Sequence, residues 1–305
     1  MSASERPAVG PRSPGFRAKV WVAGARPRTL GAGVAPVLVG TAAAASPTWI
    51  RAFGCLVVAL GLQVGVNFAN DYFDGVRKVD TDARVGPVRL TASGLASPRA
   101  VRMAALIAFA VAVAVGAWLA LTTAPWLLLL GAAAICAAVL YSGGPAPYAA
   151  RGLGEISVFL FFGLTACVGT AYVQGTTVPA AAWWGAVAVG LLAVAILVAN
   201  NLRDIVTDAA AGKRTLAVRL GDRRTREAYR VCLAVAFASP IVGAAVGALP
   251  ACALLSLAAL PVAARPFMAM GTARGRDLVP VLVATSLVDV LFGVLLAGGL
   301  WIARI

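Results

Sequence analysis

The sequence of 305 residues contains no histidine and few acidic residues, with 12 Asp and Glu against 26 Lys and Arg. The absence of histidine excludes any chemistry that uses imidazole as a base or as a metal ligand. The five cysteines stand singly in apolar runs without CxxC spacing, which indicates small buried side chains and neither disulfides nor a zinc site. Because acidic residues are scarce, the position of each one is informative.

Charged residues of all kinds make up only 12% of the chain, whereas hydrophobic residues make up 61%. This balance lies far from that of soluble globular proteins and predicts an integral membrane protein. The first sixteen residues are rich in Pro, Ser and Gly and lack an apolar core followed by a small-residue cleavage site. We therefore predict residues 1–16 as a disordered cytosolic tail and residues 17–305 as one membrane-embedded domain.

Nine stretches approach the roughly 20 apolar residues that a membrane-spanning helix needs. The predicted fold class is therefore all-α, an integral membrane bundle of nine transmembrane helices. The stretches cover approximately residues 28–46, 51–69, 101–122, 125–142, 155–173, 182–200, 231–248, 251–269 and 279–301.

The basic residues predict how the helices are oriented, because positive charge is retained on the cytosolic face. With the N-terminus inside, 24 of the 26 Lys and Arg residues lie in cytosolic segments, and only Arg51 and Arg304 lie outside. We expect an N-in, C-out protein of the cell membrane. Topology then accounts for most of the net charge of +14, which need not imply nucleic acid and also favours contact with anionic membrane lipid.

Eleven of the twelve acidic residues fall on the predicted cytosolic side, most of them after the second and sixth stretches. After the second, Asn67, Asn70, Asp71 and Asp74 lie at offsets 0, 3, 4 and 7, which places them on one stripe of a helix. After the sixth, Asn200, Asp204 and Asp208 lie at offsets 0, 4 and 8. The spacing Asn-x-x-x-Asp is common to both and predicts two related helix hairpins that face each other.

Carboxylates at this spacing repel one another, so a positive ligand should compensate them. Hard oxygen ligands suit Mg²⁺, which commonly joins one or two carboxylates to a substrate phosphate. Basic residues beside the acids could hold the remaining phosphate oxygens. The implied ligand is a diphosphate bound through Mg²⁺ on the cytosolic face, and the basic residues are Lys78, Arg84, Arg89, Arg203, Lys213 and Arg214.

Simpler interpretations compete with this one. Each acidic cluster alone could be a solvated face or a helix cap, but two matched clusters on one face favour a site. The segment Tyr141-Ser-Gly-Gly-Pro145 is either part of the site or an exit turn. Asp289, inside the last stretch, should face the bundle interior, where it either pairs with a cation or stays protonated.

Several segments resemble the UbiA superfamily of membrane prenyltransferases, and within it the branch that acts on 1,4-dihydroxy-2-naphthoate in menaquinone synthesis. The resemblance runs from Arg26 to the last apolar stretch. The matching segments are ARPRTL (25–30), APVLVGTA (35–42), NFANDYFDG (67–75), RVGPVR (84–89), YSGGP (141–145), GLGE (152–155) and NNLRDIVTDAAAGKRTLAVRLG (200–221).

The resemblance implies a Mg²⁺-dependent polyprenyltransferase with nine transmembrane helices. Asp71, Asp74, Asp204 and Asp208 would hold the metal on a polyprenyl diphosphate, and Tyr141 could assist as a base. An aromatic acceptor would be alkylated with loss of CO₂ and diphosphate, giving demethylmenaquinone. The substrate-binding residues would be Asn67, Asn70, Lys78, Arg84, Arg89, Asn200, Asn201, Arg203, Lys213 and Arg214.

The chain departs from the superfamily pattern at three places. Lys78 stands where many relatives have an acid, so Asp80 and Asp82 are left as supporting acids. Gly31 replaces a usual proline, and the segment from Pro145 to Gly152 matches the naphthoate branch more loosely. These departures bear on the acceptor contacts more than on the metal.

Three rival functions share some of these features. The same fold could use another acceptor, such as 4-hydroxybenzoate, haem or a phosphoribose donor. A CDP-alcohol phosphotransferase requires DGxxAR followed by GxxxDxxxD, which DGVRKV does not satisfy. A cation-coupled transporter could use paired carboxylates and Asp289, but transporters usually bind their substrate near the membrane midplane on broken helices, whereas these acids gather on one face.

Overall fold

The computed structural model describes residues 14–77, 86 and 89–304, and within them every regular element is a helix. Seven helical segments are long and apolar enough to cross a membrane. They are Trp49–Val76 (α3), Pro98–Thr123 (α4), Gly154–Gly175 (α6 Gly154–Val158, the π-helix η3 Phe159–Thr165 and α7 Ala166–Gly175), Ala180–Arg203 (α8), Leu216–Ala245 (α10), Ala251–Ala269 (η4 Ala251–Ala259 and α11 Leu260–Ala269) and Gly275–Ile302 (η5 Gly275–Asp277 and α12 Leu278–Ile302).

Two further apolar helices are shorter, Gly31–Ala43 (α2) and Leu127–Ser142 (α5), with 13 and 16 residues. At 1.5 Å per residue they are about 20 and 24 Å long, less than the roughly 30 Å of a hydrocarbon core. The all-helical fold predicted from the sequence is confirmed for the described residues. Each of the nine predicted stretches overlaps one of these helical segments, but the count of nine membrane crossings stays a prediction.

Four short helices complete the fold: Pro14–Ala25 (α1), Pro27–Thr29 (η1), Ala149–Arg151 (η2) and Ile205–Ala210 (α9). Helix α1 begins at Pro14, inside the segment predicted as a tail, and the remainder of that tail lies outside the described residues. Trp21 of α1 packs edge-on against Phe68 of α3, with ring centroids 5.8 Å apart. The N-terminal helix is thereby attached to the end of α3 that carries the first acidic cluster.

Two of the long helices begin at capping residues that the sequence displays. Ser97 precedes Pro98, and its hydroxyl accepts a hydrogen bond from the Ala100 amide at 3.3 Å. Thr215 does the same for Val218 at the start of α10, at 3.4 Å. Such caps satisfy amides that have no partner within the helix, and proline fits the first helical position because it has no amide hydrogen to satisfy.

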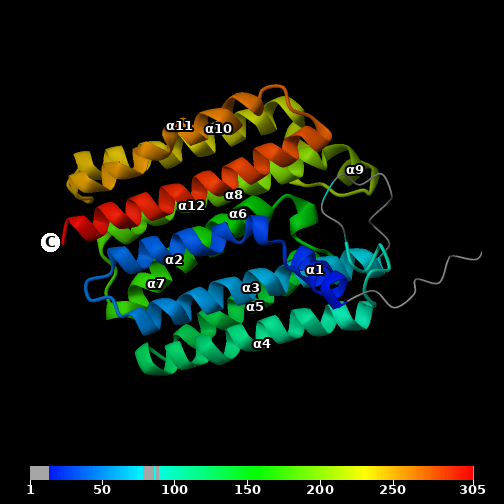
Figure 1. The fold of residues 1–305 in the computed structure, drawn as a ribbon, viewed down its shortest axis with the longest axis horizontal. Helices are drawn as coiled ribbons and strands as arrows, with labels where there is room; N and C mark the ends of the chain where they lie inside the picture. The colour runs from blue at the N-terminus through cyan, green and yellow to red at the C-terminus, as the bar shows by residue number, and fades with distance from the viewer. Residues whose placement is uncertain (1–13, 78–85, 87–88, 305) are drawn as a thin grey trace, which may run out of the picture.

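Helix α8 is the central helix of the bundle and packs against α2, α10, α12 and the π-helix η3 (Figure 1). Its buried face is rich in alanine and glycine. A Cβ atom added at Gly163 in η3 would lie 2.8 Å from the Cα of Gly190 in α8, so the two backbones touch there. Small residues permit this close packing between apolar helices, and the resulting contact fixes the π-helix against α8.

The two ends of the bundle differ in chemistry. At one end, called here the motif end, α1 and α9 lie beside the acidic clusters, and the C-terminus lies at the opposite end (Figure 1). At the opposite end, Arg51 donates hydrogen bonds to the carbonyls of Val173 at 2.6 Å and Thr122 at 3.1 Å. Arg304 donates to the carbonyls of Ala42 and Ala44. Both arginines thus satisfy carbonyls at helix C-termini, where a positive charge is favourable.

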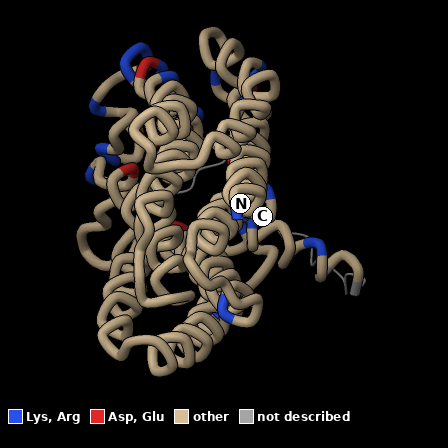
Figure 2. Tube along the Cα trace, turned by 90° about the vertical axis from the view of Figure 1, so that its left-hand side faces the viewer, with Lys and Arg blue, Asp and Glu red and all other residues tan. Residues whose placement is uncertain are grey.

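Seen along the helices, most of the trace carries neither basic nor acidic residues (Figure 2). Asp289 is the exception predicted from the sequence: it is fully buried in α12, and neither carboxylate oxygen has a hydrogen-bond partner among the described residues. It does not line the main cavity described below. Its predicted position in the bundle interior is confirmed, and the described residues provide no cationic partner within 4.0 Å.

Candidate active site

The described part of the bundle encloses a cavity of about 1410 Å³ among α1, α2, α3, α5, η3 and α8. Its polar lining gathers at the motif end. Toward the opposite end the lining becomes apolar and reaches Val37, Cys55, Leu119, Leu127 and Val173. The cavity therefore combines a polar mouth with a long apolar interior, a shape suited to a polar head group that carries a hydrocarbon chain.

The first wall of the mouth is the C-terminal part of α3. Asn67, Asn70 and Asp74 line the cavity from one stripe of this helix, as their spacing predicts. Asn67 donates to the Ala25 carbonyl at 2.9 Å, and Asn70 accepts a hydrogen bond from the Ser142 hydroxyl. These contacts hold both amides in fixed orientations at the cavity wall.

Asp74 forms a buried ion pair at this wall. Its Oδ2 accepts a hydrogen bond from Arg89 at 2.7 Å, and both side chains are largely buried. The pair joins α3 to the segment that follows the undescribed residues 78–85, and both partners face the cavity. A carboxylate and a guanidinium are therefore presented side by side to any ligand in the mouth.

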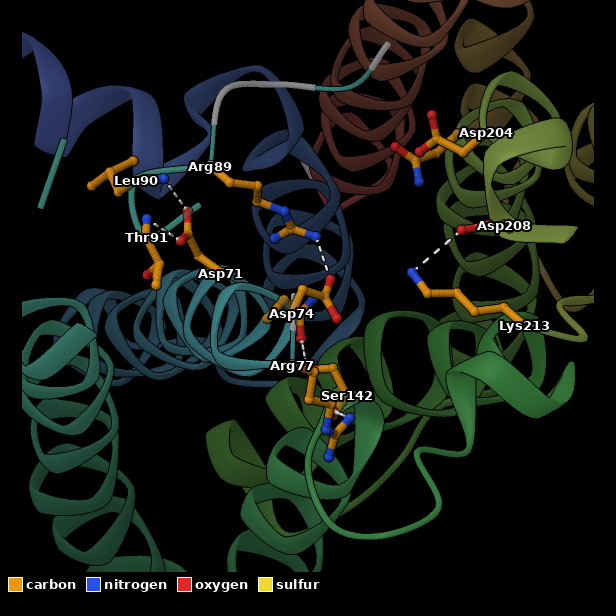
Figure 3. Close-up of polar contacts among 12 residues, drawn as sticks. Asp71, Asp74, Arg77, Arg89, Leu90, Thr91, Ser142, Asp204, Asp208 and Lys213 are labelled. Atoms are coloured by element: carbon orange, nitrogen blue, oxygen red, sulfur yellow. Dashed lines mark hydrogen bonds and ion pairs between the residues drawn. The ribbon is translucent and has the colours of Figure 1, made fainter. Parts of the chain in front are cut away.

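Asp71 lies differently from its predicted neighbours. It is 2% exposed and does not line the cavity. Its two carboxylate oxygens instead accept hydrogen bonds from the backbone amides of Leu90 at 2.7 Å and Thr91 at 2.9 Å (Figure 3). Both oxygens thus help to fix the segment that positions Arg89, and the role of Asp71 as a metal ligand stays a prediction.

The second wall of the mouth is the junction of α8 and α9. Asp204 caps both helices with φ −95° and ψ 5°, so the helical path breaks there. Its carboxylate receives two hydrogen bonds from Arg203, at 2.8 and 2.6 Å, and Arg203 also donates to Asn200 at 2.9 Å. Asp208 follows one turn later and pairs with Lys213 at 3.3 Å. All five residues line the cavity.

The two walls face each other across the mouth. Figure 3 shows Asp74 and Arg89 on one side, with Asp204, Asp208 and Lys213 on the other. Among the described residues, seven basic side chains and three acidic ones line the cavity, an excess of four positive charges. The basic residues are Lys19, Arg26, Arg28, Arg77, Arg89, Arg203 and Lys213. This charge favours a polyanion in the mouth.

The donor set can be tested for Mg²⁺. No group of three cysteine or acidic side chains among the described residues is close enough to form a complete metal site. However, Asp74, Asp204 and Asp208 supply carboxylate oxygens from both walls, and Asn70 supplies an amide oxygen. Mg²⁺ typically takes one or two protein carboxylates and completes its shell with water and substrate phosphate. The oxygen donors therefore fit a metal held jointly by the protein and a diphosphate.

The remaining predicted residues divide into three groups. Tyr141 and Asn201 line the cavity. Arg214 is exposed and does not line it; its backbone amide donates to the Ala150 carbonyl at 2.7 Å, so proximity in sequence to Lys213 does not bring its side chain to the site. The predicted residues that lie outside the described chain are Lys78, Arg84, Asp80 and Asp82.

Sequence reasoning missed Arg77, which lines the cavity, and Glu155, which contacts the cavity-lining Asn201. Arg77 lines the cavity and donates hydrogen bonds to the carbonyls of Ser142, at 2.8 Å, and Gly144. Its position three residues after Asp74, at the C-terminal cap of α3, could have indicated it. Glu155 is buried and accepts a hydrogen bond from Asn201 at 2.9 Å. No local pattern signals that contact, because the two residues lie 46 positions apart.

Two tyrosines meet at the cavity wall between α5 and α6. The rings of Tyr141 and Tyr148 pack edge to face with centroids 5.5 Å apart. The Tyr148 hydroxyl bonds to the Ala137 carbonyl at 2.9 Å and to the Ser157 hydroxyl at 2.8 Å. Burial raises the pKa of Tyr148 above its ordinary value, although the bond with Ser157 opposes this. The Tyr148 phenol therefore stays protonated at neutral pH and presents an aromatic, neutral wall.

The fold and the cavity together define a helical membrane protein with two polar walls at one end of an apolar chamber. Residues 33–279 match the sequence pattern of the UbiA prenyltransferase family. The chain is also 49% identical over 284 residues to the 1,4-dihydroxy-2-naphthoate octaprenyltransferase of Mycobacterium tuberculosis, a match covering 92% of this chain and 96% of that protein. The chain belongs to the UbiA prenyltransferase family, and it is a multi-pass membrane protein.

Solved structures show the same fold. A UbiA homolog from Aeropyrum pernix superposes with a TM-score of 0.66 at 17% identity, covering 90% of this chain and 98% of that one. A UbiA homolog from Archaeoglobus fulgidus, solved bound to DMAPP and Mg²⁺, gives 0.64 at 16% identity, with coverage of 90% and 98%. At this level of identity the likeness establishes the fold, and the chemistry must be argued from the residues of this chain.

Proposed function

We propose that this protein transfers a polyprenyl chain from a polyprenyl diphosphate to 1,4-dihydroxy-2-naphthoate, with release of diphosphate and CO₂. The observation that carries the proposal is the cavity itself, in which a mouth with an excess of four positive charges leads into an apolar chamber. A diphosphate matches the mouth and an isoprenoid chain matches the chamber. The name of the Mycobacterium tuberculosis relative, 49% identical across nearly the whole chain, supports the naphthoate acceptor.

The diphosphate is assigned to the space between the two walls. Arg77 and Arg89 approach it from the α3 side, and Arg203 and Lys213 approach it from the α8 side. Guanidinium groups bind phosphate oxygens through paired hydrogen bonds, and lysine adds a compact charge. These residues bind the ground-state diphosphate and stabilise the additional negative charge that develops on it as the allylic C–O bond breaks.

Asp74, Asp204, Asp208 and Asn70 are the residues that would hold Mg²⁺. When bound, the metal supplies positive charge to the diphosphate oxygens and so makes diphosphate a better leaving group. That a UbiA homolog from Archaeoglobus fulgidus was solved with DMAPP and Mg²⁺ supports the choice of metal. Asp71 is assigned to positioning, because its contacts hold the backbone that carries Arg89.

The apolar chamber orders the hydrocarbon chain and keeps water from the reactive carbon. Its walls include Ala134, Phe161, Phe162 and Gly169. Excluding water prevents hydrolysis of an allylic cation. A ring carbon of the electron-rich naphthoate attacks the allylic carbon, a C–C bond forms, and departure of the carboxyl group as CO₂ restores the aromatic ring. The balanced product is the hydroquinone form of demethylmenaquinone.

Tyr141 is proposed to form a hydrogen bond with a hydroxyl group of the acceptor. It lines the cavity, as Asn201 does, and Tyr148 packs against its ring. A strong base is unnecessary because the carboxyl group leaves the alkylated carbon as CO₂, and the electron pair of the broken C–C bond restores the aromatic ring without proton abstraction. Tyr141 therefore orients the acceptor by hydrogen bonding more than it drives the chemistry.

The proposed topology has nine membrane crossings, with the N-terminus and the active site on the cytoplasmic face of the cell membrane. In this arrangement the motif end is cytoplasmic, which follows the rule that positive charge is retained inside. The short helices α2 and α5 would then cross only where the bundle or the adjoining loops make up the missing length. Cysteine labelling from either side of the membrane at Ser46 and Ser93, which lie at opposite ends of the bundle, tests the orientation.

The function is tested with protein purified in detergent, a labelled polyprenyl diphosphate and a panel of acceptors that includes 4-hydroxybenzoate. We expect prenylated, decarboxylated product from 1,4-dihydroxy-2-naphthoate, loss of activity with EDTA, and recovery on adding Mg²⁺. Product from another acceptor alone would retain the enzyme class and reject the naphthoate assignment. Failure to release diphosphate with every acceptor in the panel would reject the enzyme class.

A further inference from the structure

A second cavity, of about 450 Å³, lies at the motif end but outside the active site. It is formed by the N-terminal part of α10 and the turn between α11 and η5, which Figure 1 shows at the same end of the bundle as α9. None of its lining residues lines the main cavity. They are Asp222, Arg223, Arg226, Glu227, Arg230, Gly271, Thr272 and Arg274.

Arg226 fixes the walls of this second cavity. It is buried and donates hydrogen bonds to the carbonyls of Met270 and Ala273, the latter at 2.9 Å. It also pairs with Asp222 at 2.7 Å. The turn after α11 is therefore tied to α10 by one side chain that reaches across 44 to 47 residues of sequence. The cavity is a formed feature of the fold because its walls are joined.

Charge within the cavity is only partly balanced. Arg223 pairs with Glu227 at 3.0 Å, and Arg226 pairs with Asp222. Within the described chain, no carboxylate lies within 4.0 Å of Arg230 or Arg274. Two acids thus face four arginines, which leaves an excess of two positive charges.

Arg230 is held in an unusual environment for a guanidinium. Its Cζ lies 5.5 Å from the centre of the Phe267 ring, and a Cβ on Gly271 would lie 2.9 Å from its Nη2. Its Nε is buried, with no hydrogen-bond partner among the described residues. Withdrawing a charged donor from water without a partner is unfavourable. A bound anion would supply the missing partner.

The surface beside the cavity is apolar. Val231, Phe267 and Met268 are exposed, with Met268 67% exposed. Such side chains are suited to contact with acyl chains on the lipid-facing side of a membrane protein. The cavity therefore lies at a boundary between cationic groups and an apolar surface, where a phospholipid head group meets its chains. Basic pockets between membrane helices bind anionic head groups by this combination.

We propose that the second cavity binds the phosphate group of an anionic phospholipid such as phosphatidylglycerol. Arg230 and Arg274 bind the phosphate oxygens, the Thr272 hydroxyl donates a further hydrogen bond, and the acyl chains lie along Val231 and Met268. A free phosphate shares the head-group chemistry but would make no use of the apolar surface.

The test compares lipid retention by native mass spectrometry after the purified full chain is mixed with phosphatidylglycerol or phosphatidylcholine. We expect the wild-type protein to retain phosphatidylglycerol preferentially. The R230Q/R274Q variant should bind it about 30-fold more weakly, which corresponds to roughly 1 kcal/mol for each removed charge. The control R265Q/R276Q removes two exposed arginines near the same turn that do not line the cavity, and it should retain the lipid as wild type does.

Three outcomes would overturn the proposal. One is an equal loss of phosphatidylglycerol binding in the cavity variant and in the control, because net charge alone would then explain the effect. Another is equal retention of both lipids by wild type. The third is binding of inorganic phosphate without any retention of phosphatidylglycerol. R274Q alone is the safeguard against misfolding, because the Arg274 side chain is exposed and makes no hydrogen bond to the described residues; it should weaken retention by about 5-fold.

Discussion

Asp71 and Asp74 lie three residues apart in one acidic motif, yet their contacts predict different effects of the same substitution. Replacement by Asn should lower stability at Asp71 and weaken metal binding at Asp74. Asp71→Asn replaces one carboxylate oxygen by an amide group that faces a backbone N–H donor of Leu90 or Thr91. A hydrogen bond to a charged group contributes about 1.5–3 kcal/mol. We expect D71N to lose about this much stability, because the residue is buried and the opposing donor remains unsatisfied.

Asp74→Asn removes a charge that faces the cavity and contacts Arg89. If Asp74 holds the metal, D74N should raise the Mg²⁺ concentration needed for half-maximal activity at least tenfold, about 1.4 kcal/mol of lost metal binding. D71N should leave that concentration within about twofold of wild type, since its carboxylate does not line the cavity. The D71N substitution should instead lower the thermal stability and the amount of folded enzyme.

The assay is prenyl transfer by detergent-purified enzyme across a Mg²⁺ titration, together with thermal unfolding of each variant. D277N serves as the control because Asp277 is exposed and lies outside both cavities. The reasoning is refuted if D71N raises the half-maximal Mg²⁺ concentration tenfold while its unfolding temperature stays at the wild-type value. That result would return Asp71 to the metal site.

Two further predictions concern the other parts of the cavity. Asp204→Ala leaves Arg203 buried without its carboxylate partner and should lower the free energy of unfolding by about 3–5 kcal/mol. It should also abolish diphosphate release. Near-normal turnover by a folded D204A would contradict the assignment. Gly169→Leu places a side chain into open space in the chamber, so activity should fall more for long prenyl diphosphates than for short ones. Gly298→Leu, also in open space but outside the cavity, is the control, and equal losses with all chain lengths would contradict the prediction.

Local pattern was sufficient for much of the fold. Runs of apolar residues located every long helix, because a helix in a membrane must satisfy its backbone internally and cover itself with apolar side chains. The apolar pattern did not predict where a helix ends, or a short helix that is held by tertiary contacts. The apolar run at 28–46 is longer than the helix α2 that it forms. Helix α1 escaped notice because it is only 12 residues long and its contact with Phe68 is remote in sequence.

The candidate site divides in the same way. The offsets in the first acidic motif correctly placed Asn67, Asn70 and Asp74 on one wall. The same offsets placed Asp71 on that stripe too, but Asp71 does not line the cavity. The stripe is about 100° wide, so residues at its two edges face different neighbours. Helical periodicity alone does not tell which edge faces the cavity and which faces the segment at Leu90 and Thr91.

By itself, the sequence determined that the chain is an all-helical membrane protein with two matched polar motifs at one end, because hydrophobic run length and helical periodicity are local properties. Only the tertiary structure decided which acids face the chamber. The backbone at Leu90 and Thr91 folds back to occupy both oxygens of Asp71, across 19 and 20 residues. The same fold carries Arg89 to Asp74, across 15 residues. Contacts at such separations depend on how the connecting segment folds, which no local spacing encodes.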